Sequence, residues 1–304
     1  LKGSTGTGFE KKTHVHKDWW ATTISYDDAM ENLQRSAEER EDILEPVKNI
    51  SAVVNEDGEF AFNVQGREFV PTDWSLQQFS IRSNVPSSTV IQKLRLQEDF
   101  DADDAAIMAG LANNALRRLN QDKIYRMRTY TDGTCRAFVT DRYAPIDNRW
   151  YLEQLQNNLP EGRLSHWRGD EDTIFGNILL PDTIIDYGQS DDSDYGGMMS
   201  IGNCEIGKRR IQQVPSLFRS ICLNGCIWGQ VSGSAIKKRH IGNIDLVELG
   251  GQITANINEQ LPLLPMGVRK LLELRELDCL DATMKSVFAA VAMENKFSKN
   301  EASE

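Results

Sequence analysis

Apolar and polar residues alternate with two different periods along this chain, and the two periods predict both helices and strands. Apolar side chains at helical spacing predict helices over residues 27–42, from Trp74, from Pro86, over 101–120, and after Asp147-Asn148. Ser25 or Asp27 would cap the first of these helices. Short alternating runs joined by Gly-containing turns predict two strand pairs, 50–54 with 59–64 and 124–130 with 135–140.

The second half of the chain changes character twice. Short β-like segments dominate residues 164–241, with one predicted helical interruption at 215–224 that Gly225 ends. Pro262 and Pro265 then interrupt the chain, and residues 266–297 are nearly continuous helix formers. The pattern predicts an α+β fold with mixed antiparallel sheets, packed helices and a helical C-terminal region.

These changes of character predict three parts of the chain. We expect a flexible N-terminal arm over 1–22, an α+β core over 23–245 and a helical C-terminal extension over 246–304. The amphipathic C-terminal helices would either mediate self-association or cover the core.

Composition narrows the class of protein. Of the 304 residues, 40% are hydrophobic and 26% charged, which is ordinary for a globular protein. No apolar run approaches the ~18 residues of a membrane helix, and the N-terminus lacks a signal-peptide pattern. We therefore expect a cytoplasmic protein with no membrane partner. Five scattered cysteines indicate reduced thiols, and with only four histidines we predict no metal and no cofactor.

The sequence contains only incomplete forms of the familiar catalytic and ligand-binding motifs. Gly3–Gly8 lacks the Gly-Lys-Ser/Thr ending of a phosphate loop. The aspartates that begin at Asp99 lack the Gly and Glu that a calcium loop needs at its sixth and twelfth positions. His166 and His240 are the only histidines outside the arm, and no G-x-S-x-G elbow is present. We predict a non-enzymatic protein, although catalytic groups brought together from distant residues stay possible.

The net charge of −11 conceals a strong segregation of charge. Residues 117–149 hold eight basic and four acidic residues, and residues 206–244 hold seven basic residues and no acid. Taking these excesses of +4 and +7 from −11 leaves −22 on the rest of the chain. A polyanion responds to local potential more than to total charge, so the basic segments are candidates for nucleic-acid contact.

Two interpretations of this segregation stay open. In one, cations and aromatic rings of the two segments bind single-stranded nucleic acid. In the other, acidic and basic parts pair within the chain or between subunits. Strand alternation weakens the first for residues 124–130, because Tyr125 and Arg126 would point to opposite faces. The candidate nucleic-acid-binding residues are Arg126, Arg128, Arg136, Arg142, Tyr143, Lys208, Arg209, Arg210, Arg219, Lys237, Lys238 and Arg239.

Two sequence blocks resemble a known family. Residues 134–148 run Arg136-Ala137 through Asp141-Arg142-Tyr143 to Asp147-Asn148, and a second block joins Ile201–Gly207 to Pro215–Gly225. Together they resemble the phage/plasmid-like protein family known as domain of unknown function 932, over roughly residues 40–245. Cys204 replaces the serine usual in that family, and its Trp-His-Gly-like motif is not evident around Trp19–Trp20.

The resemblance implies a mobile-element role near DNA replication or recombination, and it brings no catalytic residues. It leaves two hypotheses for the function. The first is a homo-oligomeric protein that binds single-stranded DNA for annealing or protection. The alternative is a structural protein that assembles into a homo-oligomer through charge-complementary surfaces.

Overall fold

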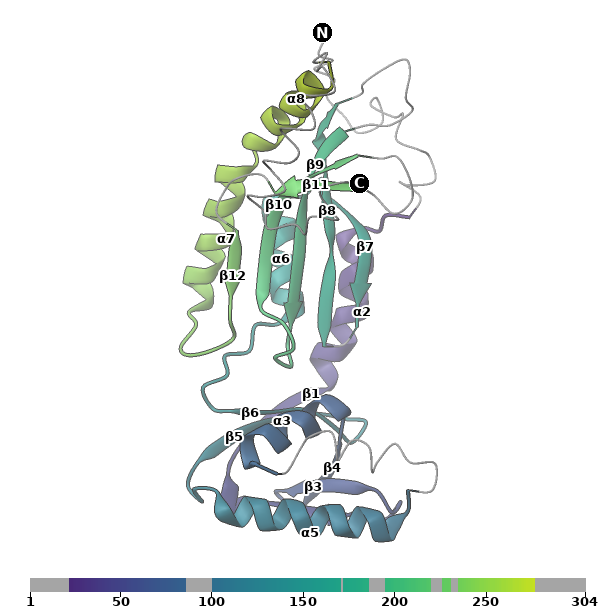
Figure 1. Cartoon of the computed structure of the whole chain (residues 1–304), viewed down its shortest axis with the longest axis vertical. Helices are drawn as coiled ribbons and strands as arrows, with labels where there is room; N and C mark the ends of the chain where they lie inside the picture. The colour runs from purple at the N-terminus through teal and green to yellow at the C-terminus, as the bar shows by residue number, and fades with distance from the viewer. Residues whose placement is uncertain are drawn as a thin grey trace, which may run out of the picture.

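A computed structural model describes residues 22–85, 100–170, 172–185, 195–219, 226–230 and 235–276. It has an α+β fold, as the sequence predicts, with the described strands in two six-stranded sheets. Each sheet has its own hydrophobic core. The two sheets form the centres of two lobes that follow one another along the long axis of the molecule (Figure 1).

The first lobe holds the sheet of order β1-β5-β6-β4-β3-β2. Neighbouring strands are antiparallel except for the parallel pair β4 and β6. Two helices, α3 (Asp73–Ser83) and α5 (Ala102–Arg118), pack against it, and a short 3-10 turn, Val47–Asn49, follows the first strand. The strands are β1 (Arg40–Pro46), β2 (Ile50–Val54), β3 (Phe60–Val64), β4 (Arg67–Pro71), β5 (Ile124–Tyr130) and β6 (Thr134–Thr140).

Aromatic rings fill the centre of the first lobe. Phe62, Phe79 and Phe138 lie within 5.4 Å of one another, centroid to centroid, and Tyr125 lies 4.9 Å from Phe138. Arg126 is half-buried on the opposite side of β5 from Tyr125, so the predicted alternation of ring and cation along that strand is confirmed.

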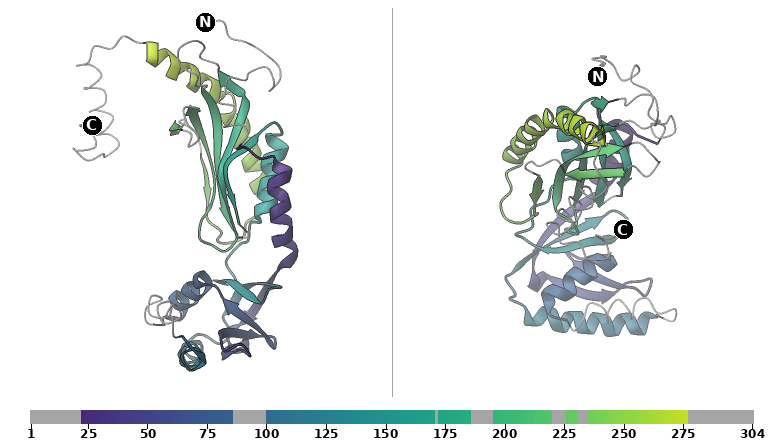
Figure 2. Two further views of the ribbon diagram at one scale, coloured as in Figure 1. Left: turned by 90° about the vertical axis from the view of Figure 1, so that its right-hand side faces the viewer. Right: turned by 45° about the horizontal axis from the view of Figure 1, so that its top comes forward.

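The second lobe holds an antiparallel sheet of order β11-β10-β9-β8-β7, with β12 paired to the start of β10. Its strands are β7 (Arg163–Gly169), β8 (Thr173–Ile185), β9 (Tyr195–Cys204), β10 (Ile211–Arg219), β11 (Cys226–Gln230) and β12 (Ile236–Lys238). One face packs against four helices, seen edge-on in Figure 2. These are α2 (Tyr26–Glu39), α6 (Asn148–Asn158), α7 (Leu246–Gln260) and α8 (Leu263–Glu276).

The described C-terminal helices belong to this second core. Leu249, Ile253 and Ile257 of α7 and Leu264 and Val268 of α8 are buried with the apolar residues of β8, β9 and β10. The sequence left two roles open for the C-terminal helices, self-association and coverage of the core. Residues 246–276 cover the core. Among the described residues, no helix combines the length and apolar character needed to cross a membrane.

Two secondary-structure predictions are wrong within the described residues. The helix predicted over 27–42 ends at Glu39, and residues 40–42 begin β1, where they pair with β5. Residues 215–219 belong to β10 and not to a helix. Leu217 and Phe218 point to opposite faces of the sheet, and both are buried, so the strand places more apolar surface in the core than a one-sided helix would. Three predictions lie outside the described residues: the arm before residue 22, the helix from Pro86, and the helix beyond residue 276.

Candidate functional site

The turn between β9 and β10 reaches the first lobe and is held there. The carbonyl oxygen of Ile206 accepts hydrogen bonds from Trp74 Nε1 at 2.8 Å and from Gln78 Nε2 at 2.7 Å. Gln78 also accepts a bond from the Phe138 amide through Oε1 at 2.8 Å. Gly207 follows with a φ of +79°, a conformation that side chains rarely adopt. Two side chains of α3 therefore hold the backbone of this turn against the first lobe.

Three consecutive cations lie on the outer rim of the turn. Lys208, Arg209 and Arg210 are all exposed. The Lys208 ammonium lies 5.8 Å from the centre of the Trp74 ring, and the Arg209 guanidinium lies 5.7 Å from that of Phe175. The fixed backbone and the neighbouring rings restrict the positions of these cationic side chains.

Four further cations lie at the same end of the second sheet. Lys238 pairs in register with Ile211, the residue after Arg210, which brings β12 and its continuation beside the turn. The amide of Gly242 donates to the carbonyl of Arg142 at 2.8 Å, and this bond brings in the loop after β6. We call the resulting group the basic edge: Arg142, Lys208, Arg209, Arg210, Lys237, Lys238 and Arg239.

The basic edge is accessible and unneutralised. Six of its side chains are exposed and that of Lys238 is half-buried. No carboxylate among the described residues forms an ion pair with any of the seven. Removing their charge from the net −11 leaves −18 on the remaining residues. The edge is a local positive surface on an otherwise acidic chain.

The other predicted arginines of the first lobe are neutralised by carboxylates. Arg126 and Arg128 both contact Asp42, at 3.0 and 2.8 Å, and Arg128 is only 3% exposed. Arg136 contacts Asp132 at 2.9 Å and lies 3.9 Å above the Tyr130 ring. The structure does not bring these three arginines to the basic edge, so we do not retain them in the candidate site.

The last two predicted residues are also separate from the edge. Tyr143 is buried, its hydroxyl donates to the Glu205 carbonyl at 2.8 Å, and burial raises the pKa of that hydroxyl. Arg219 ends β10, at the opposite end of the strand from the basic turn, and its side chain lies outside the described residues.

A buried charge cluster joins the lobes beneath the basic turn, and sequence reasoning missed it. The carboxylate of Glu205, 3% exposed, contacts Arg40 and lies 3.0 Å from Arg128. It also accepts the Asn148 amide at 2.6 Å, at the start of α6. Asp147, expected to cap that helix, instead pairs with Arg40 at 2.6 Å and makes no capping bond. Glu205, which is distant in sequence, therefore supplies the carboxylate that caps the start of α6 in place of Asp147.

Burial and the neighbouring arginines act in opposite directions on the pKa values of the carboxylates in this cluster. Burial raises the pKa of Glu205, and Arg40 and Arg128 only partly offset this. For Asp42, burial also acts upward, but the hydrogen bond and charge of Arg128 prevail and its pKa is lowered. Opposite charges with satisfied hydrogen bonds make this cluster a structural junction between the lobes.

Two titratable groups at the border of the junction have displaced pKa values. Burial raises the pKa of Asp172 to about 6, although Tyr130 donates a hydrogen bond to it at 3.2 Å. Burial lowers the pKa of His240 to about 4, and its ring stacks on that of Tyr143 at 5.4 Å. No nucleophile lies paired with a base here among the interactions of the described residues, so the displaced values carry no catalytic assignment.

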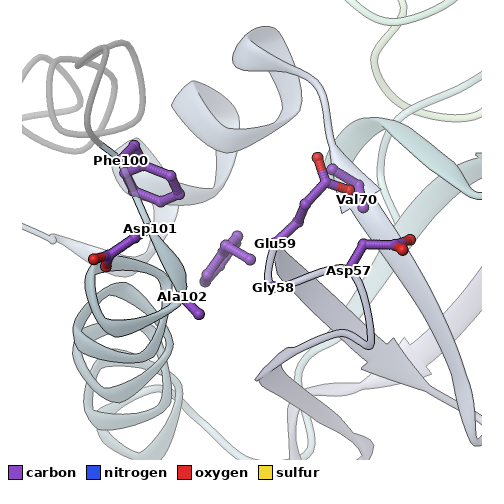
Figure 3. A pocket seen from close by; sticks show the side chains of 8 residues that line it. Asp57, Gly58, Glu59, Val70, Phe100, Asp101 and Ala102 are labelled. Carbon is purple, nitrogen blue, oxygen red and sulfur yellow. The ribbon is translucent and has the colours of Figure 1, made fainter.

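A separate cavity of about 340 Å³ lies in the first lobe between the β2–β3 turn and the start of α5. Asp57, Glu59 and Asp101 line it together with apolar side chains. Figure 3 shows the carboxylates of Asp57 and Asp101 pointing to opposite sides, and Asp101 bonds the first turn of α5. No group of side chains suited to hold a metal occurs in the part of the chain that the structure describes.

Comparisons with known proteins give this site no precedent. No family model, no curated protein and no solved structure matches the chain.

Proposed function

We propose that this protein binds nucleic acid at the basic edge, with single-stranded DNA as the preferred ligand and no catalytic step. The observation that carries the proposal is the gathering of seven cations without carboxylate partners among the described residues, in a chain of net charge −11. Phosphates that bind there release counterions, and this gain depends on local charge and not on the total. Acidic surface more than ~8 Å away is largely screened at physiological salt.

The aromatic rings beside the basic edge support a single strand over a duplex. A duplex keeps its bases stacked on one another, so it would use only the cations of the edge. A single strand follows a narrow basic track and stacks its bases on nearby planar groups. Phe175 and Trp74 lie beside the cations of the turn. Protection or annealing of single strands would fit the role near DNA replication or recombination that the sequence resemblance implies.

Binding of labelled oligonucleotides over a salt series tests this proposal. With about five phosphate contacts, affinity for single-stranded DNA should fall roughly 100-fold between ~50 and ~200 mM salt, and duplex of equal length should bind more weakly. Fluorescence anisotropy measures both. The triple variant Lys208→Ala/Arg209→Ala/Arg210→Ala should lose at least about 10-fold at ~50 mM salt and show a shallower salt slope.

A matched variant separates the basic edge from total charge. Lys48→Ala/Arg67→Ala/Lys123→Ala also removes three positive charges, but from exposed positions of the first lobe. This variant should bind single-stranded DNA within about 3-fold of the parent. Equal losses in the two triple variants, or no salt-dependent binding by the parent, would overturn the proposal.

A further inference from the structure

Helix α5 has an exposed face that no described part of the chain covers. It lies at the far end of the first lobe, away from the second lobe (Figure 1). Ala105, Met108, Ala112 and Leu116 on its inner face are buried against the sheet. The outer stripe, at helical spacing, is Asp103, Ala106, Ile107, Gly110, Leu111, Asn114 and Arg117.

The middle of this outer stripe is apolar and flat. Ile107 and Leu111 are 60% and 46% exposed, one turn apart. Gly110 lies between them, and a Cβ added there would meet no atom within 4 Å. Glycine in a helix interior costs about 1 kcal/mol relative to alanine, and nothing in the described residues packs against Gly110 to offset that cost. A backbone without a side chain at this point allows another helix to approach closely.

The two ends of the stripe carry opposite charges. Asp103 and Asp104 lie in the first turn of α5, and Arg117 and Arg118 lie in the last. Neither arginine pairs with a carboxylate of the described residues. Asp103 and Arg117 are each seven residues from Gly110, which corresponds to about 10 Å along the helix axis on either side. When two copies of α5 lie antiparallel, the acidic end of each helix therefore faces the basic end of the other.

We propose that two copies of this chain associate through α5, with the helices antiparallel about a two-fold axis at Gly110. The axis places Ile107 and Leu111 of the two copies in one apolar centre. Asp103 of each copy lies opposite Arg117 and Arg118 of the other, as an isologous interface requires. The inference is independent of nucleic-acid binding.

The size of this contact sets the expected affinity. The 17 residues of α5 span about 25 Å, and a single helix pair buries less than the ~1,200 Å² of a standard interface. We therefore expect a reversible dimer with a dissociation constant in the micromolar range, measurable by sedimentation velocity between ~1 and ~100 µM protein.

Charge complementation tests the pairing directly. Asp103→Arg places arginine against arginine across the axis, and Arg117→Asp places aspartate against aspartate, so each variant alone should dimerise at least roughly 10-fold more weakly. Mixing the two variants restores opposite charges on both sides of the axis, and heterodimers should form with near-parent affinity. Val247→Asp, at a site 86% exposed in α7, is the control and should leave dimerisation unchanged.

A crosslink locates the axis. Gly110→Cys should join to itself between copies with a short bismaleimide, well above the background of the unsubstituted chain, whereas Val247→Cys should not. A chain that stays monomeric at ~100 µM would overturn the proposal. So would an oligomer that neither charge variant weakens and that Gly110→Cys does not crosslink.

Discussion

Several residues of the junction owe their chemistry to partners that are distant in sequence. Asp147 occupies the N-cap position of α6, where aspartate usually bonds the first free amides. Arg40 attracts its carboxylate instead, and Glu205 bonds the Asn148 amide. Asp172 is a similar case, because burial in the fold is the largest cause that raises its pKa to about 6.

Asp172 should make the stability of the protein depend on pH in a predictable direction. Its folded-state pKa of about 6 exceeds the ~3.9 of an unfolded chain. The folded state therefore binds the proton more tightly, and this group stabilises the fold increasingly as pH falls from about 7 toward about 4. Asp172→Asn, neutral throughout, should be more stable than the parent at pH ~7, by up to about 3 kcal/mol.

Urea unfolding of the parent and Asp172→Asn at several pH values measures this effect. His240, whose pKa is lowered to about 4, has the opposite effect on stability. Because its buried ring is neutral, the folded protein loses stability as the pH falls and the ring must take up a proton. This effect acts equally in both proteins and cancels from their difference. A difference that stays constant between pH ~7 and ~4.5 would contradict the assignment to Asp172.

At the scale of elements, α5 protects an open edge of the first sheet. β2 is the last strand of that sheet, so one side of its backbone lacks a neighbouring strand. Asn113 of α5 supplies the missing partners, accepting from the Ala52 amide at 2.8 Å and donating to the Ala52 carbonyl at 2.7 Å. One amide side chain thus replaces a strand and joins helix to sheet.

Removing this amide should destabilise the first lobe. Asn113→Ala leaves the backbone groups of the buried Ala52 without their partner, and we expect a loss of about 1–3 kcal/mol in the free energy of unfolding. Asn114→Ala, one residue along and with no hydrogen bond to lose among those of the described residues, is the control and should change it by less than about 0.5 kcal/mol. Denaturant titration at low protein concentration measures both, and equal effects would refute the edge role.

For the whole molecule, we infer that the buried junction couples the two lobes in folding. Each lobe has its own core, and the cluster between them contains Glu205 and Arg128, both 3% exposed. Paired buried charges add little net stability over apolar residues, but removing one partner leaves the others uncompensated. The junction therefore aligns the lobes and holds the basic turn in position.

Glu205→Gln should uncouple the lobes. The variant leaves Arg40 and Arg128 without that carboxylate, and we expect a loss of about 3–5 kcal/mol. Native-state hydrogen exchange should then show the two sheets opening separately, whereas the parent protects both to similar free energies. Glu41→Gln, which removes the exposed partner of Arg67, should cost less than about 1 kcal/mol. Uniform exchange in Glu205→Gln would argue against the junction as the coupling element.

Local sequence by itself determined the elements whose periodicity is strong. The strands at 50–54 and 124–130 have the predicted bounds, and α5 begins at Ala102, one residue after its predicted start at Asp101, because neighbouring residues alone supply these signals. Six of the seven cations of the basic edge lie within residues 206–244, and this segregation of charge is also readable from the chain because no acid interrupts that segment.

Tertiary structure alone decided which charges are available and where the lobes meet. The partners of Arg128 are 77 and 86 residues away, and the pair of Arg40 and Glu205 spans 165. Residues 215–219 became a strand because β9 and β11 lie on either side. Ion pairs and sheet neighbours depend on chain folding over such separations, and no local period encodes them. Local sequence therefore determined the strongly periodic elements and the segregation of charge, and tertiary packing determined which of the cations form the site.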